Sequence, residues 1–369
     1  MSEDILLSDT DTEAALRAAV SDLLAAHCDP ASVARAYEGD RSTSARIWKP
    51  LASELGISGL LIPENRGGAG GSARDAAVVL EELGRFVAPV PYLTSSVIAA
   101  TVLLAGDSEL LGRLGAGEVT VALLAPFSAA SSAGVPRLVK DVNGRVSGRA
   151  TSVAGVLDAD VLLAAVDTVD GTEIHAISID AVTVTPVVSL DMTRPLADVA
   201  VESVQGQVVV SAQEGDCAVR TGLRDGAALL ASEQAGAATW CLEKTVEYLK
   251  IRRQFGRVVG GFQSLKHRLA DLYVEVETAT AVARYAAGAV AAADPDAAVG
   301  TAVAASYCSE VSVKAGEEGV QLHGGVGMTW EYPLHLYLKR AKADQIALGS
   351  PGYHRAVLAE LVDLRLGEG

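Results

Sequence analysis

The second half of the chain is dominated by long, alanine-rich segments whose apolar residues recur at helical spacing, and these segments limit the possible folds most strongly. The three longest are Val219–Lys250, Gln263–Ala293 and Ala297–Leu322, and two shorter ones follow at Pro333–Ala347 and Gly352–Leu364. Long helices joined by short connections are typical of antiparallel bundles. We therefore predict a C-terminal four-helix bundle within residues 213–369.

The first and middle parts of the chain differ in their periodicity. Residues 1–118 contain shorter helical patterns. Residues 119–212 contain short runs of β-branched residues separated by turn signals such as Asn143-Gly144 and Asp170-Gly171. Strands at this spacing, without helices between them, favour an antiparallel sandwich or barrel. The predicted fold class is therefore α+β, with an N-terminal α-helical domain over 1–118, a middle antiparallel β domain over 119–212 and the helical bundle over 213–369.

Composition and charge argue against several classes of function. A net charge of −16 and the lack of a basic cluster argue against nucleic-acid binding, because phosphate backbones are bound by clustered Lys and Arg. The four cysteines are too far apart in sequence to indicate a zinc site or a disulfide framework, and no metal site is expected. No apolar run of membrane-spanning length is free of charge or Gly, and the acidic start Met1-Ser-Glu-Asp lacks the apolar core of a signal peptide. We expect a cytoplasmic protein.

Two short Gly-containing breaks interrupt the helical patterns, at Ile251–Gly256 and Gln321–Gly327. Such breaks bring polar groups to helix ends, and helix N-termini carry unpaired N–H groups and a partial positive charge that suit anions. We therefore expect the two breaks to hold the phosphates and the adenine end of a dinucleotide. Taken alone, each break has a simpler interpretation, as a solvated loop charge at Arg252 and as a plain helix break at Gly324-Gly325. The Gly-rich stretch 59–71 lacks the Lys-Ser/Thr of a P-loop and is expected to be a shaped loop that covers a ligand.

Six motifs along the chain are each short, but together their order indicates a protein family. They are residues 61–71, the Glu81-Glu-Leu-Gly stretch, Arg252-Arg-Gln-Phe-Gly, Phe262-Gln263, Gln321-Leu-His-Gly-Gly-Val-Gly, and the segment from Glu331 to Lys342. In this order the motifs resemble the acyl-CoA dehydrogenase family of flavoenzymes over nearly the whole chain. The resemblance implies FAD as cofactor, an acyl-CoA substrate, and a homodimer, a homotetramer or an α2β2 heterotetramer with another acyl-CoA dehydrogenase subunit. It also implies electron-transfer flavoprotein as a partner.

The resemblance also implies roles for individual residues. Arg252 and Phe255 would contact the ADP half of an FAD that belongs to the neighbouring subunit, through a charge-assisted hydrogen bond and a ring contact respectively. Gln263 would form a hydrogen bond with the cofactor. The backbone of Gln321, Leu322, His323, Gly324 and Gly325 would wrap the pyrophosphate, where glycines permit close approach.

The chain departs from the family where the catalytic base is expected. The family removes the substrate's α-proton with a Glu carboxylate, and the equivalent position here is Leu348, which cannot accept a proton. Some members carry the base near the start of the first bundle helix, which corresponds here to Gly226, flanked by Asp225. Asp225 is the nearest acid and is our candidate base, although one helical residue rotates a side chain by about 100°. The alternative is that Asp225 faces solvent or stabilises its helix terminus.

The middle domain and the remaining motifs are less specific. The family's flavin-binding stretches are only partly recognisable here, and Thr151 and Ser152 are the candidates for one of those roles. Trp240 and Trp330 are expected in the core or at an interface rather than against flavin. His323, His335 and His354 do not show metal-ligand spacing. The run Lys339-Arg340-Lys342 is expected to be a solvated helix face, with an interface role as the second choice.

Three functions follow from these patterns. The first is an acyl-CoA dehydrogenase that desaturates an acyl-CoA thioester, such as one with a steroid side chain or another bulky acyl group. The second is a catalytically silent subunit that completes the FAD site of a heteromeric acyl-CoA dehydrogenase, as in some actinobacterial members of the family. The third is a family member with altered flavin chemistry that needs no α-proton base.

Overall fold

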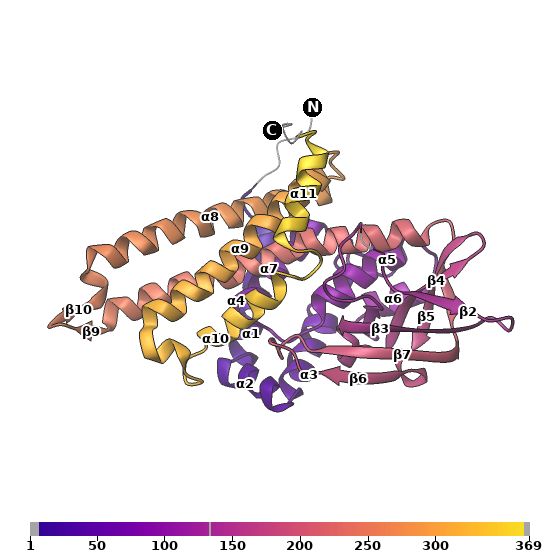
Figure 1. The fold of residues 1–369 in the computed structure, drawn as a ribbon, viewed down its shortest axis with the longest axis horizontal. Coiled ribbons are helices and arrows are strands. Elements are labelled where there is room, and N and C mark those ends of the chain that lie inside the picture. Colours follow the sequence, from indigo (N-terminus) through magenta and orange to yellow (C-terminus); the bar gives the residue numbers. More distant parts are fainter. Residues whose placement is uncertain (1–6, 133, 365–369) are drawn as a thin grey trace, which may run out of the picture.

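A computed structural model describes residues 7–132 and 134–364 and shows three parts in chain order (Figure 1). Helices come first, a sheet follows, and long helices complete the chain, so the predicted order of elements is confirmed. The acidic start Met1–Asp4, on which the expectation of no signal peptide rests, lies outside the described residues. Within the described residues, no helix is long and apolar enough to cross a membrane.

Within the described residues, the N-terminal part contains six α-helices, and capping side chains set the starts of four of them. Thr10 and Glu13 form a reciprocal capping box at the first helix, and Ser72 and Asp75 form another at the fourth. A π-helical segment over Tyr92–Ala99 leads directly into the fifth helix and is buried throughout. The helices are α1 Asp11–His27, α2 Pro30–Ala34, α3 Ser42–Lys49, α4 Ala73–Arg85, α5 Ala100–Leu104 and α6 Glu109–Gly115.

The middle part is an eight-stranded sheet with the order β6-β7-β3-β2-β4-β5-β8, in which β1 also pairs with β4. The strands are β1 Val121–Leu123, β2 Arg137–Lys140, β3 Arg145–Ala154, β4 Val161–Thr168, β5 Gly171–Ser178, β6 Thr183–Val187, β7 Leu196–Gln205 and β8 Gln207–Val210. The sheet is mixed rather than purely antiparallel, because β1 and β2 both run parallel to β4. Short strands separated by turns suggest hairpins between consecutive strands. Instead, β4 follows β3 in the chain but pairs with the two earlier strands β1 and β2.

Alternation along β4 separates two cores. Leu162, Ala164 and Val166 face a core enclosed by the sheet, whereas Leu163 and Ala165 face the larger core shared with the helices. This period of two residues follows from the pleat of a strand. The sheet is therefore buried against the bundle on one face, and this contact positions the site described below.

The C-terminal part is organised along α7 (Gly215–Ile251), which packs against α8 (Gln263–Ala291), α9 (Ala297–His323) and α4. A Cβ at Gly84 would lie 2.0 Å from the Glu233 carbonyl oxygen, and one at Gly236 would lie 1.9 Å from that of Glu81, so only glycine allows this crossing of α4 and α7. The shorter helices α10 (Leu334–Asp344) and α11 (Pro351–Leu361) follow. Between α7 and α8 the chain forms the small hairpin β9 (Arg253–Gln254) and β10 (Arg257–Val258), far from the sheet in Figure 1.

The Gly-rich loop 59–71 packs against α6. A Cβ at Gly59 would lie 2.8 Å from the carbonyl oxygen of Gly115, and one at Gly67 would lie 3.2 Å from the Cα of Gly112. Close backbone contact therefore explains these glycines without a ligand. The expectation that this loop covers a ligand has no support from these contacts.

Candidate functional site

The structure brings the two predicted breaks together at one end of the bundle. Tyr248, in the last turn of α7, stacks on His323, the last residue of α9, with ring centroids 4.2 Å apart and an interplanar angle of 21°. Tyr332 packs on the other side of His323 at 4.5 Å. His323 is buried, and its Nδ1 lies 2.7 Å from the Gly319 carbonyl oxygen, so this ring positions the end of α9 rather than meeting solvent.

The end of α7, the hairpin of β9 and β10, and the start of α8 form an arm that projects beyond the rest of the molecule (Figure 1). The first break forms the tip of this arm. Phe255 and Gly256 link the two strands of the hairpin, with φ angles of +52° and +72°. Such two-residue turns favour Asn, Asp or Gly, because positive φ strains other side chains. Phe255 is nevertheless 87% exposed at this turn. Its ring packs edge-on against Phe262, with ring centroids 6.2 Å apart. Strain of this kind is typical of functional positions, so the exposed Phe255 ring is a candidate binding group.

The polar candidates on the arm are open to solvent. Arg252 is exposed, and its side chain makes no hydrogen bond or ion pair within the described part of the chain. Gln263 is the first residue of α8, and its side-chain nitrogen lies 3.3 Å from Nε2 of His267. Both side chains are therefore accessible from solvent.

The second break differs from the expectation in one respect. Gln321–Gly325 lies at the carboxyl end of α9, so the helix N-terminus argument for anion binding does not apply there. Gly324 has a φ of +64°, and a Cβ on Gly324 or Gly325 would meet no described atom within 4 Å. Gln321 is exposed and Leu322 is half-buried. The backbone of the two glycines is thus accessible to a ligand, and packing does not explain why position 325 is glycine.

A pocket of about 270 Å³ lies between the middle domain and the end of α10. It is lined by Phe127, Ser128, Ser152, Ser189–Asp191, Arg194, Leu196 and residues of the segment 342–347. Ser152 has a φ of +53°, accepts from the Phe127 N–H at 2.9 Å through its carbonyl oxygen, and donates its own N–H to Asp198 at 2.8 Å. Of the two candidates in the middle domain, Ser152 lines this pocket, whereas Thr151 is exposed beside it.

The two positions where the family carries its base are neighbours in space. A Cβ on Gly226 would lie 3.3 Å from Cδ1 of Leu348 and 2.7 Å from Ile98. Leu348 is 2% exposed and has a φ of +52°, and its N–H donates to the Phe127 carbonyl oxygen at 2.8 Å. Leu348 and Ile98 both line an apolar cavity of only about 20 Å³. Neither Gly226 nor Leu348 offers a proton acceptor.

Asp225 pairs with the neighbouring residue Arg224. Its carboxylate accepts from Nε of the adjacent Arg224 at 2.9 Å, and it is absent from the residues that line the cavity. Burial raises the pKa of Asp225, and the Arg224 charge opposes that rise. Arg224 thus holds the Asp225 carboxylate, one residue along α7 from the position of the missing base.

A buried cluster of charges lies directly behind the 270 Å³ pocket. Arg340 is 1% exposed and donates from Nη1 to Glu233 at 2.5 Å and from Nη2 to Thr193 at 2.6 Å, with a third donation from Nε to Asp191 at 2.5 Å. Arg194 connects the same Glu233 to Asp344, at 2.6 and 2.5 Å. The expectation that Lys339-Arg340-Lys342 is a solvated helix face is therefore wrong for Arg340. The burial of Arg340 could not be predicted from the sequence, because its partners Asp191 and Glu233 lie in a distant loop and on α7.

The cluster contains three carboxylates and two guanidinium groups, so one carboxyl tends to hold a proton. Burial, reinforced by the charge of Glu233, raises the pKa of Asp344 to about 7 although Arg194 opposes the rise. Burial alone would also raise the pKa of Asp191, but the charge of Arg340 and the Thr193 hydroxyl lower it. The cluster clamps the end of α10 and the turn that carries Leu348.

Trp240 and Trp330 do not line the 270 Å³ pocket. Trp240 stacks on Tyr337 with ring centroids 3.7 Å apart, which agrees with a packing role. Trp330 is 61% exposed and packs edge-on against Tyr37, with Lys339 over its ring, so it does not belong to the core of the single chain.

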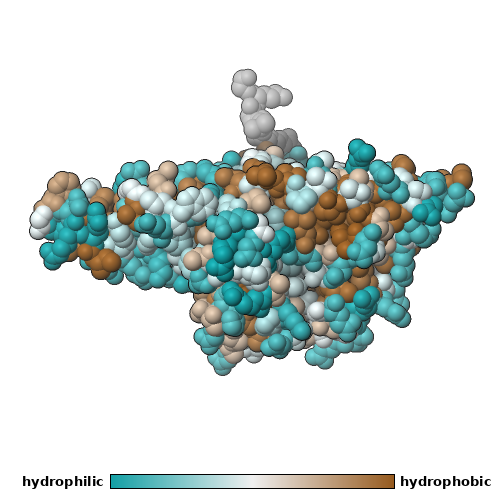
Figure 2. Space-filling view, turned by 90° about the horizontal axis from the view of Figure 1, so that it is seen from below, coloured by the Kyte–Doolittle hydropathy of each residue, from teal (hydrophilic) through white to brown (hydrophobic). Residues whose placement is uncertain are grey.

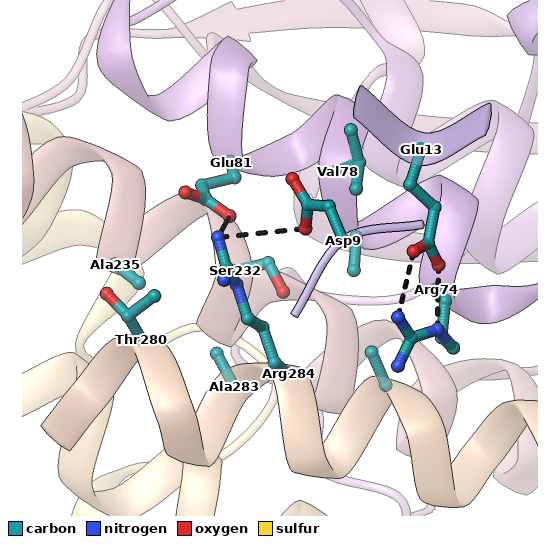
Figure 3. A pocket seen from close by; sticks show the side chains of 12 residues that line it. Asp9, Glu13, Arg74, Val78, Glu81, Ser232, Ala235, Thr280, Ala283 and Arg284 are labelled. Atoms are coloured by element: carbon teal, nitrogen blue, oxygen red, sulfur yellow. Dashed lines mark hydrogen bonds and ion pairs between the residues drawn. The ribbon is translucent and has the colours of Figure 1, made fainter. Parts of the chain in front are cut away.

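A second polar cavity, of about 20 Å³, lies between α1, α4, α7 and α8 (Figure 3). Arg74 donates to Glu13 from Nε at 2.7 Å, and Arg284 lies 3.4 Å from Glu81. The hydrogen bond from Arg74 lowers the pKa of Glu13 to about 2. This cavity has no room for a dinucleotide, and its ion pairs attach the N-terminal segment to the bundle.

Comparisons with known proteins identify the family. The model of the acyl-CoA dehydrogenase N-terminal domain matches residues 10–114, and that of the C-terminal domain matches residues 214–362. Acyl-CoA dehydrogenase IpdE2 of Mycobacterium tuberculosis is 38% identical to this chain, over 94% of this chain and 95% of its own length. The chain belongs to the acyl-CoA dehydrogenase family.

Solved structures of acyl-CoA dehydrogenases show the same architecture. The Tcur3481-Tcur3483 steroid ACAD is 26% identical with a TM-score of 0.82, covering 96% of this chain and 98% of its own. The ChsE4-ChsE5 complex from Mycobacterium tuberculosis has a TM-score of 0.85 at 23% identity, covering 98% and 99%, and supports the fold alone.

Proposed function

We propose that this chain is an FAD-dependent acyl-CoA dehydrogenase that introduces an α,β double bond into a bulky acyl-CoA, and that a second chain completes its cofactor site. The observation that carries the proposal is the arm, where the unpaired Arg252 and the strained, exposed Phe255 lie at the same end of the bundle as the open glycines of α9. The steroid ACAD relative motivates the bulky acyl group. A cytoplasmic location stays a prediction of the sequence.

The residues of the arm fit the ADP half of FAD. A guanidinium without a protein partner suits a pyrophosphate oxygen, an exposed aromatic ring suits an adenine, and accessible glycine backbone permits close approach. The 270 Å³ pocket beside Ser152 is the candidate for the flavin half. When bound, FAD supplies the acceptor for the hydride that leaves the substrate's β-carbon.

One chain cannot bring both halves of the site together. A Cβ at Gly226 would touch Leu348, which follows the pocket residue Ala347. Gly226 and Arg252 are about 39 Å apart along α7 at 1.5 Å per residue. The helix is continuous between them. A shared site, with the arm of one chain serving the pocket of its neighbour, accounts for this separation.

The α-proton requires an acceptor, and the structure leaves two sources. Asp225 stays the candidate within the chain, since burial raises its pKa, although it is bonded to Arg224. The second source is a carboxylate on a partner subunit, with this chain completing the partner's site. It is favoured because Leu348 and Gly226, the two positions where the family carries its base, adjoin each other here and neither can accept a proton. Family membership and the similarity to the acyl-CoA dehydrogenase IpdE2 favour a dehydrogenase over a catalytically silent subunit.

Flavin content tests the cofactor assignment. Arg252→Ala should lower the flavin retained on purification, because the variant loses the only charge assigned to the pyrophosphate, whereas Arg268→Ala, on the same arm but paired with Glu318, should retain it. Absorbance near the flavin bands, relative to protein, gives the measurement. Equal flavin content in both variants would count against the role of Arg252.

Turnover of Asp225→Asn distinguishes the two sources of the base. General-base catalysis contributes roughly 10²–10⁴-fold. A loss in that range, with an acyl-CoA panel and electron-transfer flavoprotein as acceptor, would identify Asp225 as the base. Turnover within about twofold of the parent would assign proton abstraction to the partner. The chain purified alone and the chain co-expressed with a second dehydrogenase subunit should be compared.

A further inference from the structure

Two buried polar atoms between the N-terminal helices and the bundle have no hydrogen-bond partner among the described residues. They are the hydroxyl oxygen of Ser232 on α7 and Nε of Arg284 on α8. On the face of the molecule shown in Figure 2, hydrophilic side chains reach solvent, which satisfies their hydrogen-bonding groups. These two atoms are shielded from bulk solvent, and a buried polar atom that stays unpaired costs free energy. A partner other than a protein atom is therefore expected.

The Ser232 hydroxyl differs from other hydroxyls in the bundle. Thr239 on α7, Thr280 on α8 and Ser309 on α9 each donate to the carbonyl oxygen four residues earlier in their own helix, at 2.9, 3.0 and 2.7 Å. Such a bond satisfies a buried hydroxyl within its own helix. Ser232 is 3% exposed and forms no such bond within the described chain, so its hydroxyl is available to a ligand inside the protein.

Both residues line the cavity of about 20 Å³ between α1, α4, α7 and α8. In Figure 3 their side chains face this cavity together with those of Asp9 and Glu81. The terminal nitrogens of Arg284 are occupied, because Nη1 donates to the Leu7 carbonyl oxygen at 3.1 Å and Nη2 to Glu81 at 3.4 Å. One water molecule needs only about 10–15 Å³ of such space. The cavity therefore admits a molecule of the size of water.

The charges around the cavity argue against an ion as the missing partner. Three carboxylates and two guanidinium groups line it, so its lining has a formal charge of −1, which disfavours an anion. The free Nε–H of Arg284 is a donor on a positively charged group, which disfavours a cation. A neutral molecule that both donates and accepts fits the two atoms, since it can accept from Arg284 and share a hydrogen bond with the Ser232 hydroxyl.

We propose that this cavity is a binding site for one water molecule, which accepts a hydrogen bond from Nε of Arg284 and forms a second one with the Ser232 hydroxyl. Buried water makes about three hydrogen bonds, and the carboxylates of Asp9 and Glu81 line the same cavity as further acceptors. The water joins α7 to α8 and holds the guanidinium that donates to the Leu7 carbonyl oxygen, so it fastens the N-terminal segment to the bundle. The proposal is independent of the proposed function, because neither cofactor nor substrate takes part.

A crystal structure of the full chain, at a resolution that shows ordered water, tests the proposal. A single peak should lie about 2.7–3.2 Å from both Nε of Arg284 and Oγ of Ser232. Crystals soaked in bromide and in rubidium salts reveal an ion by its anomalous scattering, and we expect no anomalous peak in the cavity. An empty cavity, a Ser232 hydroxyl turned onto its own helix, or an anomalous peak at this place would each overturn the proposal.

Urea unfolding of two variants tests the same site in solution. Ser232→Ala removes one partner of the water and should raise the equilibrium constant of unfolding about three- to tenfold, as expected for the loss of one buried hydrogen bond. The matched control Thr280→Val keeps its shape in the same cavity and loses a hydroxyl that is already bonded to the Val276 carbonyl oxygen, so it should stay within about twofold of the parent. Equal effects of the two variants would overturn the role of Ser232. Absence of flavin would refute the proposed function and leave both measurements unaffected.

Discussion

Replacing Arg340 with methionine should cost far more stability than replacing an arginine of an exposed ion pair. Arg340 donates to Asp191, Glu233 and Thr193 at a site that is 1% exposed. Glu233 keeps Arg194 in the variant, but Asp191 loses its paired guanidinium inside the protein. Leaving a buried charge without its partner costs about 3–5 kcal/mol. Methionine retains much of the volume, so the loss reflects charge rather than a cavity.

Urea denaturation measures this prediction, with Arg268→Met as the matched control. Arg268 forms a bidentate pair with Glu318, but its side chain is 43% exposed, and such pairs contribute about 0–1 kcal/mol. The double variant Asp191→Asn with Arg340→Met removes the orphaned charge and should recover part of the loss. The reasoning is refuted if Arg340→Met and Arg268→Met differ by less than about 1 kcal/mol in unfolding free energy.

Three further predictions follow from the cluster, the N-terminal ion pair and the arm. The pKa of Asp344 is about 7 in the folded chain and 3.8 in the unfolded chain, so the folded chain keeps this proton to higher pH. The stability that protonated Asp344 contributes is therefore present below about pH 4 and lost by about pH 7. Asp344→Asn should therefore flatten the fall in melting temperature over that window, and an unchanged slope would contradict the raised pKa. The pKa of Glu13 is lowered to about 2, so its contribution is present above about pH 4.5 and lost as pH falls, and Glu13→Gln should lose less stability between those values than the parent does. Phe255→Asn should raise unfolding free energy by about 0.5–1 kcal/mol, because Asn tolerates the left-handed region better, while lowering flavin retention. A stability no higher than the parent's would show that the turn is not strained.

Sequence patterns predicted the helices well because their periodicity is local. The expected segment Gln263–Ala293 corresponds to α8 at Gln263–Ala291, and Ala297–Leu322 corresponds to α9 at Ala297–His323. The direction of strand pairing is not local. A run of alternating residues records which face is buried, but not whether its neighbour is parallel, so the pairing of β1 and β2 with β4 was missed.

Burial of single charged residues was equally hard to predict. Arg340 lies in a run of basic residues on a helix, and such a run is usually solvated. Its partners Asp191 and Glu233 are 149 and 107 residues away in sequence. Only the packing of the loop before β7 onto α7 and α10 creates the cluster. By contrast, the two Gly breaks were expected to form one site, and they do lie at the same end of the bundle, although the helix-end argument was wrong for α9.

Because the arm and the pocket are far apart along α7, one experiment can decide whether a complete cofactor site forms within one chain or between two chains. If the arm of each chain serves the pocket of its neighbour, then Arg252→Ala disables the neighbour's site, whereas Ser152→Trp, which fills the chain's own pocket, disables its own. Either variant alone should lose flavin. In a symmetric dimer, random mixing puts one variant of each kind in half of the dimers, and each of those has one intact pairing of arm and pocket.

Unfolding the two variants together, refolding them as an equal mixture and adding FAD should therefore restore about a quarter of the parental flavin content. The control is the same treatment of each variant alone, which should restore none. A mixture that also recovers no flavin would mean that arm and pocket act within one chain, or that the chain does not pair with itself. Recovery, in contrast, cannot arise within a single chain, since every chain in the mixture carries one defect.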